Sequence, residues 1–170
     1  MAALRVDTAP ADEARELLRT CCGSGRWVER MLARRPFGSL EALLDAARAA
    51  WFALPPADWQ EAFAAHPRIG DLSSLRERFA GTRHLAAREQ SGVDDASEGV
   101  LAALAEGNAA YEQKFGHIFI VCATGLTAEE MLARLRARLS NDPDTEIGIA
   151  AEEQARITEL RLKKLALLEP

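Results

Sequence analysis

The chain has 170 residues, which is the size of one domain, and we expect residues 1–170 to form a single domain. Hydrophobic residues make up 48% and charged residues 28%, a composition that excludes an intrinsically disordered chain. The formal net charge of −5 at pH 7 gives no general attraction to nucleic acid or to anionic lipid. We therefore expect neither nucleic acid nor a membrane as a partner.

The cysteines and the first residues bear on the compartment. Cys21, Cys22 and Cys122 form no Cys-x-x-Cys motif, so the sequence predicts neither a disulfide framework nor a zinc site. Free thiols are typical of a reducing compartment. Residues 1–10 lack the apolar core of a secretory signal, and no segment approaches the ~18 apolar residues of a membrane helix. We expect a soluble, cytoplasmic protein.

The first half of the chain has a helical pattern. Two helices are expected over about residues 10–20 and 24–34. Apolar residues then recur at helical spacing over residues 40–54, with Ser39 at the N-cap position, until Pro55 ends that helix. Asp58 and Glu61 have the spacing of a capping box and predict a short helix that ends near residue 65.

The second half has one segment that differs from the helical pattern. Apolar residues at helical spacing predict a helix through residues 101–115. Residues 118–122 are rich in β-branched side chains and are expected to be extended. Thr127 and Glu130 have capping-box spacing, and Pro143 is placed to open a last helix that runs to about residue 168. The predicted fold class is all-α, an irregular helical bundle with one short extended segment that could line a pocket.

His66 is the most informative histidine. It opens the sequence His66-Pro67-Arg68-Ile69-Gly70-Asp71, in which the proline biases the histidine toward extended geometry. A rigid loop that holds an imidazole can present a general acid or base near neutral pH. The alternative is a turn after a helix, with the imidazole packed on Trp59 or Phe63.

Two further polar positions are candidates for binding. Glu89 beside Gln90 could supply a proton and a polar clamp, or could lie on a solvated helix face. Arg161 lies between Ile157 and Leu165 on an apolar row, so its guanidinium needs either a core carboxylate or an anionic ligand. Histidines and cysteines are not clustered, so no metal site is predicted.

Five short segments occur together in a characteristic order. They are His66-Pro67-Arg68-Ile69-Gly70-Asp71, Glu89-Gln90, Asn108 with Tyr111 and Lys114-Phe115-Gly116, Phe119-Ile120-Val121-Cys122, and Arg156-Ile157 with Leu160-Arg161-Leu162. The set resembles the 2-oxo-4-hydroxy-4-carboxy-5-ureidoimidazoline (OHCU) decarboxylase family, which acts last on the route from urate to allantoin. Each segment alone is weakly specific, but the ordered set is specific and spans most of the chain.

The resemblance implies an all-helical homodimer that decarboxylates OHCU, a small-molecule substrate, to (S)-allantoin without a cofactor. It implies that His66 is the catalytic histidine, that Glu89 is its acidic partner, and that Gln90 and Arg161 bind the substrate. The implied lining of the pocket consists of Pro67, Ala86 and the backbone of Phe119, Ile120, Val121, Cys122 and Ala123.

The sequence departs from the family pattern at two places. Ala86 occupies a position where the family usually has serine, so one substrate hydrogen bond is expected to be missing or supplied by water. His117-Ile118 replaces the usual Phe-Pro, which changes the local shape of the pocket. Two other classes stay open: a non-catalytic helical module that binds a small ureido or anionic ligand, and a different ring-opening or hydrolytic enzyme of purine breakdown.

Overall fold

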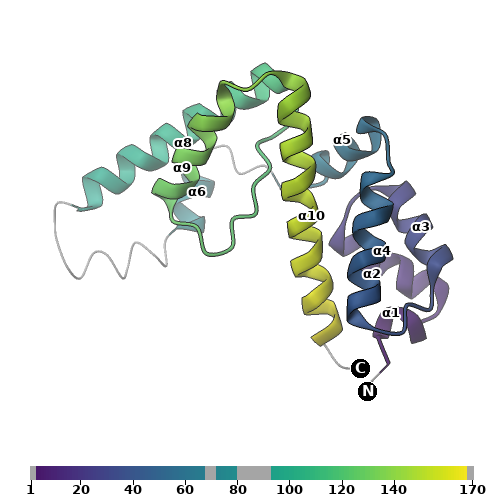
Figure 1. Cartoon of the computed structure of the whole chain (residues 1–170). Coiled ribbons are helices and arrows are strands. Elements are labelled where there is room, and N and C mark those ends of the chain that lie inside the picture. The colour runs from purple at the N-terminus through teal and green to yellow at the C-terminus, as the bar shows by residue number, and fades with distance from the viewer. Residues whose placement is uncertain (1–2, 68–71, 80–92, 168–170) are drawn as a thin grey trace. The chain divides into compact units, whose positions relative to one another are not determined.

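The computed structural model describes residues 3–67, 72–79 and 93–167 (Figure 1). Every regular element within these ranges is a helix, and none is a strand, so the all-α prediction is confirmed. The chain divides into two compact units, here called the terminal unit (residues 1–66 and 147–170) and the central unit (residues 67–146). Each unit is described by itself, and the single domain expected over residues 1–170 stays a prediction.

The terminal unit begins with three helices, which are α1 (Arg5–Thr8), α2 (Ala11–Cys21) and α3 (Gly25–Arg34). The sequence predicts α2 and α3 to within a residue. It does not predict α1, because a single turn is too short to show a hydrophobic period. The hydroxyl of Ser24 accepts a hydrogen bond from the backbone N–H of Trp27 at 3.3 Å, which fixes the start of α3.

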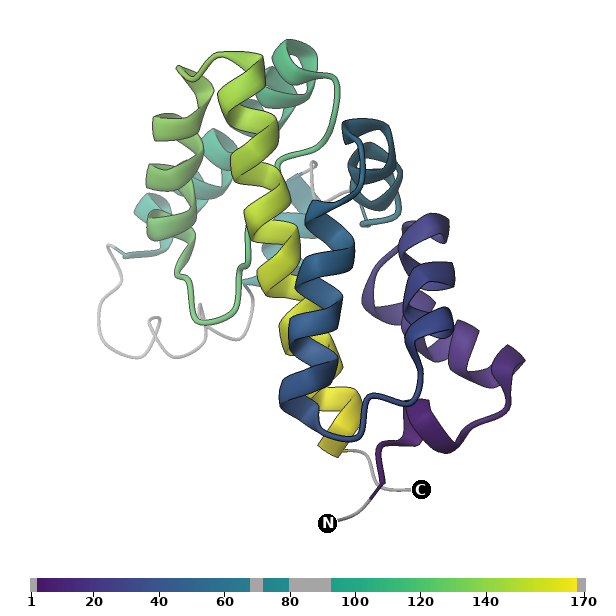
Figure 2. The same cartoon turned by 45° about the vertical axis from the view of Figure 1, so that its right-hand side comes forward.

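The next helix, α4 (Leu40–Phe52), starts where the sequence predicts. Ser39 occupies its N-cap and accepts from the backbone N–H of Ala42 at 3.1 Å. In Figures 1 and 2, α4 lies beside α10 (Pro143–Leu167), whose residues from 147 onward belong to the terminal unit. The indole N–H of Trp51 donates to the backbone oxygen of Ala151 at 2.9 Å, so a buried hydrogen bond joins the two helices.

The helix α5 (Pro56–Ala64) ends close to the expected residue, but its predicted start is wrong. It begins two residues before Asp58, because proline is already set for the first helical position. The two acidic side chains of the predicted capping box instead contact residues of α3. Asp58 pairs with Arg26 at 3.2 Å, and Glu61 accepts from the backbone N–H of Gly25 at 2.6 Å.

The central unit contains α6 (Leu72–Arg78), α8 (Val93–Phe115) and α9 (Ala128–Leu139). The last two lie side by side (Figure 1) and pack tightly, because a Cβ atom at Gly107 would lie 2.5 Å from a methyl carbon of Leu135. The core of this unit consists of Leu75, Phe79, Leu101, Leu104, Tyr111, Met131, Leu132 and Leu135. The sequence pattern does not predict α6.

The connection from α8 to α9 is not helical, as the sequence predicts, and the segment expected to be extended forms no strand. Gly116 and Gly125 lie near its two ends with φ of 79° and 80°, values that favour glycine. Residues 118–123 between them belong to no helix or strand. The predicted capping box is confirmed at its far end, where Thr127 and Glu130 exchange hydrogen bonds of 3.0 and 3.1 Å.

Candidate functional site

His66 lies at the end of α5, and close packing fixes the backbone there. Its N–H donates to the carbonyl of Phe63 at 3.2 Å. A Cβ atom at Gly23 would lie 2.4 Å from the Cβ of Ala65, so residue 23 must be a glycine for α5 to end where it does. The histidine therefore follows a turn that has little room to move.

The imidazole of His66 is half-buried and contacts α10. Its Nε2 atom shares a short hydrogen bond with Oε1 of Gln154. The amide nitrogen of Gln154 donates to the hydroxyl of Thr158 at 3.0 Å. Gln154 is fully buried and Thr158 nearly so, which makes this a hydrogen-bonded chain within the terminal unit.

Burial lowers the pKa of His66 below its usual value near 6.5. Repulsion from the positive charge of Arg161 acts in the same direction, while the hydrogen bond to Gln154 acts against it. The net effect favours the neutral form of the imidazole. The hydrogen bond to a fully buried amide fits both interpretations of this residue, a catalytic histidine and a turn histidine, so the catalytic role stays a prediction.

Arg161 is half-buried, and its guanidinium donates to the backbone oxygen of Cys21 at 3.5 Å. Within residues 3–67, 72–79 and 93–167 it forms no ion pair. The buried carboxylates of α10 serve other cations, since Glu146 pairs with Arg138 and Glu153 with Arg156. Neither of these two carboxylates is therefore the ion-pair partner of Arg161.

The two thiols beside Arg161 are free and buried. Burial raises the pKa of Cys22 to about 11, although the backbone N–H of Ser24 and the hydroxyl of Thr158 act in the opposite direction. Burial also raises the pKa of Cys21. Both are protonated at pH 7, and neither is an effective nucleophile there.

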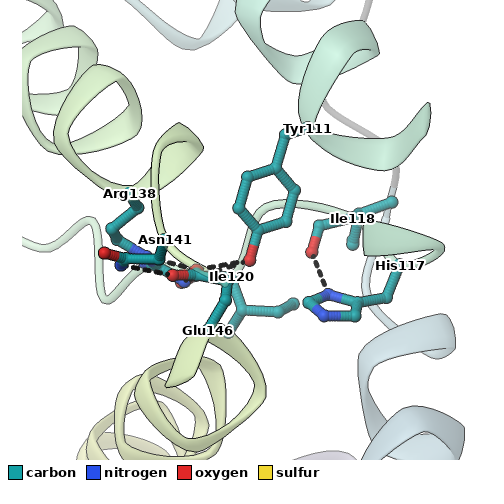
Figure 3. Close-up of polar contacts among 7 residues, drawn as sticks. All are labelled: Tyr111, His117, Ile118, Ile120, Arg138, Asn141 and Glu146. Atoms are coloured by element: carbon teal, nitrogen blue, oxygen red, sulfur yellow. Dashed lines mark hydrogen bonds and ion pairs between the residues drawn. The ribbon is translucent and has the colours of Figure 1, made fainter. Parts of the chain in front are cut away.

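The irregular segment of the central unit is held by Arg138 of α9 (Figure 3). The guanidinium donates to the carbonyl of Ile120 at 2.6 Å and lies 4.5 Å from the centre of the Phe119 ring. Ile120 is buried, whereas residues 119 and 121–123 are half-buried. The carbonyl of Ile120 is therefore held in the core, and Phe119, Val121 and Ala123 pack partly buried against the same core.

Arg138 belongs to a buried polar network that the sequence analysis does not predict. Glu146 is fully buried and accepts from the Nε atom of Arg138 at 2.6 Å, from the hydroxyl of Tyr111 at 2.5 Å and from the amide of Asn141 at 3.0 Å (Figure 3). Burial and the bond to Glu146 raise the pKa of Tyr111. One sequence signal was present, because Met131, Leu135 and Arg138 share an apolar row on α9.

The predicted site residues fall into three groups. His66 and Arg161 lie in the terminal unit, where the charge of Arg161 lowers the pKa of His66. Pro67 is exposed at the start of the central unit, which also contains residues 119–123. Ala86, Glu89 and Gln90 lie outside the described residues. Among the described residues no group of three potential metal ligands lies together, and none of the helices could span a membrane.

Comparison with known proteins gives one consistent family. The model of the family described as OHCU decarboxylase matches residues 7–163. A solved structure described as OHCU decarboxylase in the presence of (S)-allantoin superposes with a TM-score of 0.72 and 36% identity, covering 94% of this chain and 99% of that one.

Two relatives carry related names. The "Uric acid degradation bifunctional protein TTL" of Arabidopsis thaliana is 42% identical over 86% of this chain, and the OHCU decarboxylase of Amia calva is 31% identical over 66%. The chain spans 45% of the length of the first and 63% of the second. The match to the family model extends over nearly the whole sequence, and the chain belongs to the OHCU decarboxylase family.

Proposed function

We propose that this chain decarboxylates OHCU to (S)-allantoin in the degradation of urate, without a cofactor. The observation that carries the proposal is a neutral histidine next to an arginine that has no carboxylate partner among the described residues. Such a pair can polarise a substrate group and bind an anion at the same time. Membership of the family supports the same reaction.

The chemistry of the substrate explains why the protein needs no electron sink of its own. The carboxylate of OHCU is attached to a carbon next to a ring imine. When the carbon–carbon bond breaks and carbon dioxide leaves, the bonding electron pair enters the ring and the imine accepts it. One proton must then be delivered to a ring carbon on a single face, which sets the chirality of allantoin. The protein has to orient the substrate and stabilise the moving charge.

The side chains divide this work as follows. His66 polarises the hydroxyl or the carboxylate of the substrate, and Glu89 is its acidic partner in handling the proton. Arg161 holds a carbonyl or ureido group and balances developing negative charge. Gln90 binds a polar edge of the substrate. The pocket is lined by Pro67, Ala86 and the backbone of residues 119–123.

Two further parts of the proposal concern assembly and location. We propose a homodimer, on the strength of the family resemblance, and light scattering during size-exclusion chromatography measures it. We propose a cytoplasmic location because the cysteines of the chain are free thiols, which is typical of a reducing compartment.

Freshly generated OHCU provides the direct test of the reaction. Its ultraviolet absorbance decays slowly by itself, and we expect the protein to accelerate the decay, to release carbon dioxide and to give a single enantiomer of allantoin. The rate should not change when a chelator is added. Binding without faster decay would indicate the non-catalytic module, and loss of activity in the chelator would indicate a metallohydrolase.

Replacing Arg161 with alanine should mainly weaken substrate binding. A hydrogen bond to a charged group contributes about 1.5–3 kcal/mol, so we expect KM to rise roughly 10- to 100-fold while the chain stays folded. Arg156→Ala is the matched control, because Arg156 lies on the same helix with a side chain that is 62% exposed. Unfolding of the Arg161 variant with KM unchanged in the residual folded protein would instead indicate a structural ion pair.

A further inference from the structure

The geometry assigns Gln154 as a positioning residue, which holds the ring of His66 in the Nε2–H tautomer and so leaves the lone pair on Nδ1 for the reaction. This assignment rests on the proposed catalytic role of His66. It concerns a residue that the family resemblance stated above does not include.

The side chain of Gln154 has no access to solvent. Both the amide nitrogen and the amide oxygen therefore need hydrogen-bond partners inside the protein. The nitrogen end donates to the hydroxyl of Thr158, and the oxygen end faces Nε2 of His66. A carbonyl oxygen can accept a hydrogen bond but cannot donate one. The Nε2 atom of His66 must therefore carry the proton of this hydrogen bond.

The neutral ring has a single N–H group. The hydrogen bond that one ring nitrogen makes determines which of the two nitrogens carries the proton. Because the N–H lies on Nε2, the Nδ1 atom carries the lone pair. Among the described groups, the charged side chain that acts on the ring is Arg161 of α10. The acidic groups of α5 have partners elsewhere, Asp58 with Arg26 and Glu61 with Gly25.

One face of α10 supplies both the orienting amide and the guanidinium. Gln154, Thr158 and Arg161 are spaced by four and then three residues, so they lie on the same side of the helix. A rigid helix can hold such groups more accurately than a loop, because its backbone positions are fixed by the hydrogen bonds between turns. The same helix therefore orients the imidazole and places a cation near it.

Two substitutions separate orientation from packing. Gln154→Glu keeps the shape and the acceptor but adds a negative charge, which favours the imidazolium and raises the pKa of His66. Gln154→Leu removes the acceptor at similar volume. Outer partners that orient a histidine contribute about 10- to 100-fold in activity, and we expect kcat of the leucine variant at pH 7 to fall by that factor.

The pH profile provides the first readout. In the Gln154→Glu variant the acid limb of kcat should move to higher pH, and activity lost at pH 7 should return as the pH is raised further. Gln60→Glu is the matched control, because Gln60 is exposed on α5 and the same charge there should leave the profile unchanged. A Gln154→Glu profile identical to that of the wild type contradicts the assignment.

Nitrogen-15 NMR of the histidine rings provides a readout that does not depend on activity. The His66→Asn variant identifies the resonances of residue 66, and their shifts distinguish the two neutral tautomers. We expect Nε2–H in the wild type and a mixture of tautomers in Gln154→Leu. The Nδ1–H tautomer in the wild type overturns the assignment even if the protein is a decarboxylase, whereas an inactive protein with the Nε2–H tautomer overturns the proposed function alone.

Discussion

The His66→Ala variant should lose nearly all turnover of OHCU while its fold stays intact. A positioned acid–base group contributes about 10²–10⁴ in rate, and we expect kcat/KM to fall by at least that factor. The side chain is half-buried, and within the described part of the chain it shares a hydrogen bond with Gln154. Its loss should therefore lower the free energy of unfolding by no more than about 1–3 kcal/mol. Absorbance decay of OHCU and thermal melting followed by circular dichroism measure the two effects.

Free imidazole serves as the control for a catalytic rather than a structural role. If the lost group acts directly on the substrate, imidazole added to the alanine variant should restore part of kcat without changing its melting temperature. A variant that keeps most of its activity, or that is inactive because it unfolds, contradicts the assignment of His66.

The pH dependence of stability gives a second consequence of the same substitution. Because the pKa of His66 is lower in the folded than in the unfolded chain, the unfolded chain binds more protons between the two values. The stabilising contribution of neutral His66 is therefore present above pH ~6.5 and is lost as the pH falls through the folded pKa. In His66→Ala this part of the pH dependence should disappear, which denaturant unfolding at several pH values measures.

The helices that the sequence predicts well are those whose caps are local. Ser39 bonds to a residue three positions on, and Thr127 does the same with Glu130, so the spacing alone contains the information. Asp58 and Glu61 have similar spacing but bond to residues of another helix. A capping box cannot be distinguished from two such tertiary contacts without knowing which helices are neighbours.

The site shows the same division between local and distant information. His66 is identifiable from the loop it opens, and Arg161 from its place on an apolar row. Their roles come from the family resemblance, since no spacing relates residue 66 to residue 161. Gln154 cannot be identified from the sequence as a partner of His66. The two residues are 88 positions apart, and only the fold brings them together. Buried polar partners on separate helices leave no periodic signal in a sequence.

The Arg138→Met variant should be the most destabilised of those considered for this chain. Glu146 is fully buried, and removing its cation leaves a charge that neither water nor another cation among the described residues compensates. Breaking one side of a buried ion pair costs about 3–5 kcal/mol. The carbonyl of Ile120 loses its donor as well. Urea unfolding followed by circular dichroism measures the change. The matched control is Arg136→Met, on the exposed side of the same helix, which should lower the free energy of unfolding by less than about 0.5 kcal/mol.

A second substitution tests whether the uncompensated charge is the cause. Replacing a buried ion pair by apolar groups of similar size is often close to neutral, so Arg138→Met with Glu146→Leu should recover much of the stability lost by Arg138→Met alone. Recovery will be incomplete, because Tyr111 and Asn141 also donate to Glu146. If the double variant is as unstable as the sum of the single variants, the two side chains are independent and the network does not hold residues 119–123 through this pair. If they are coupled, amide exchange at residues 119–123 should be fast in Arg138→Met and slower again in the double variant.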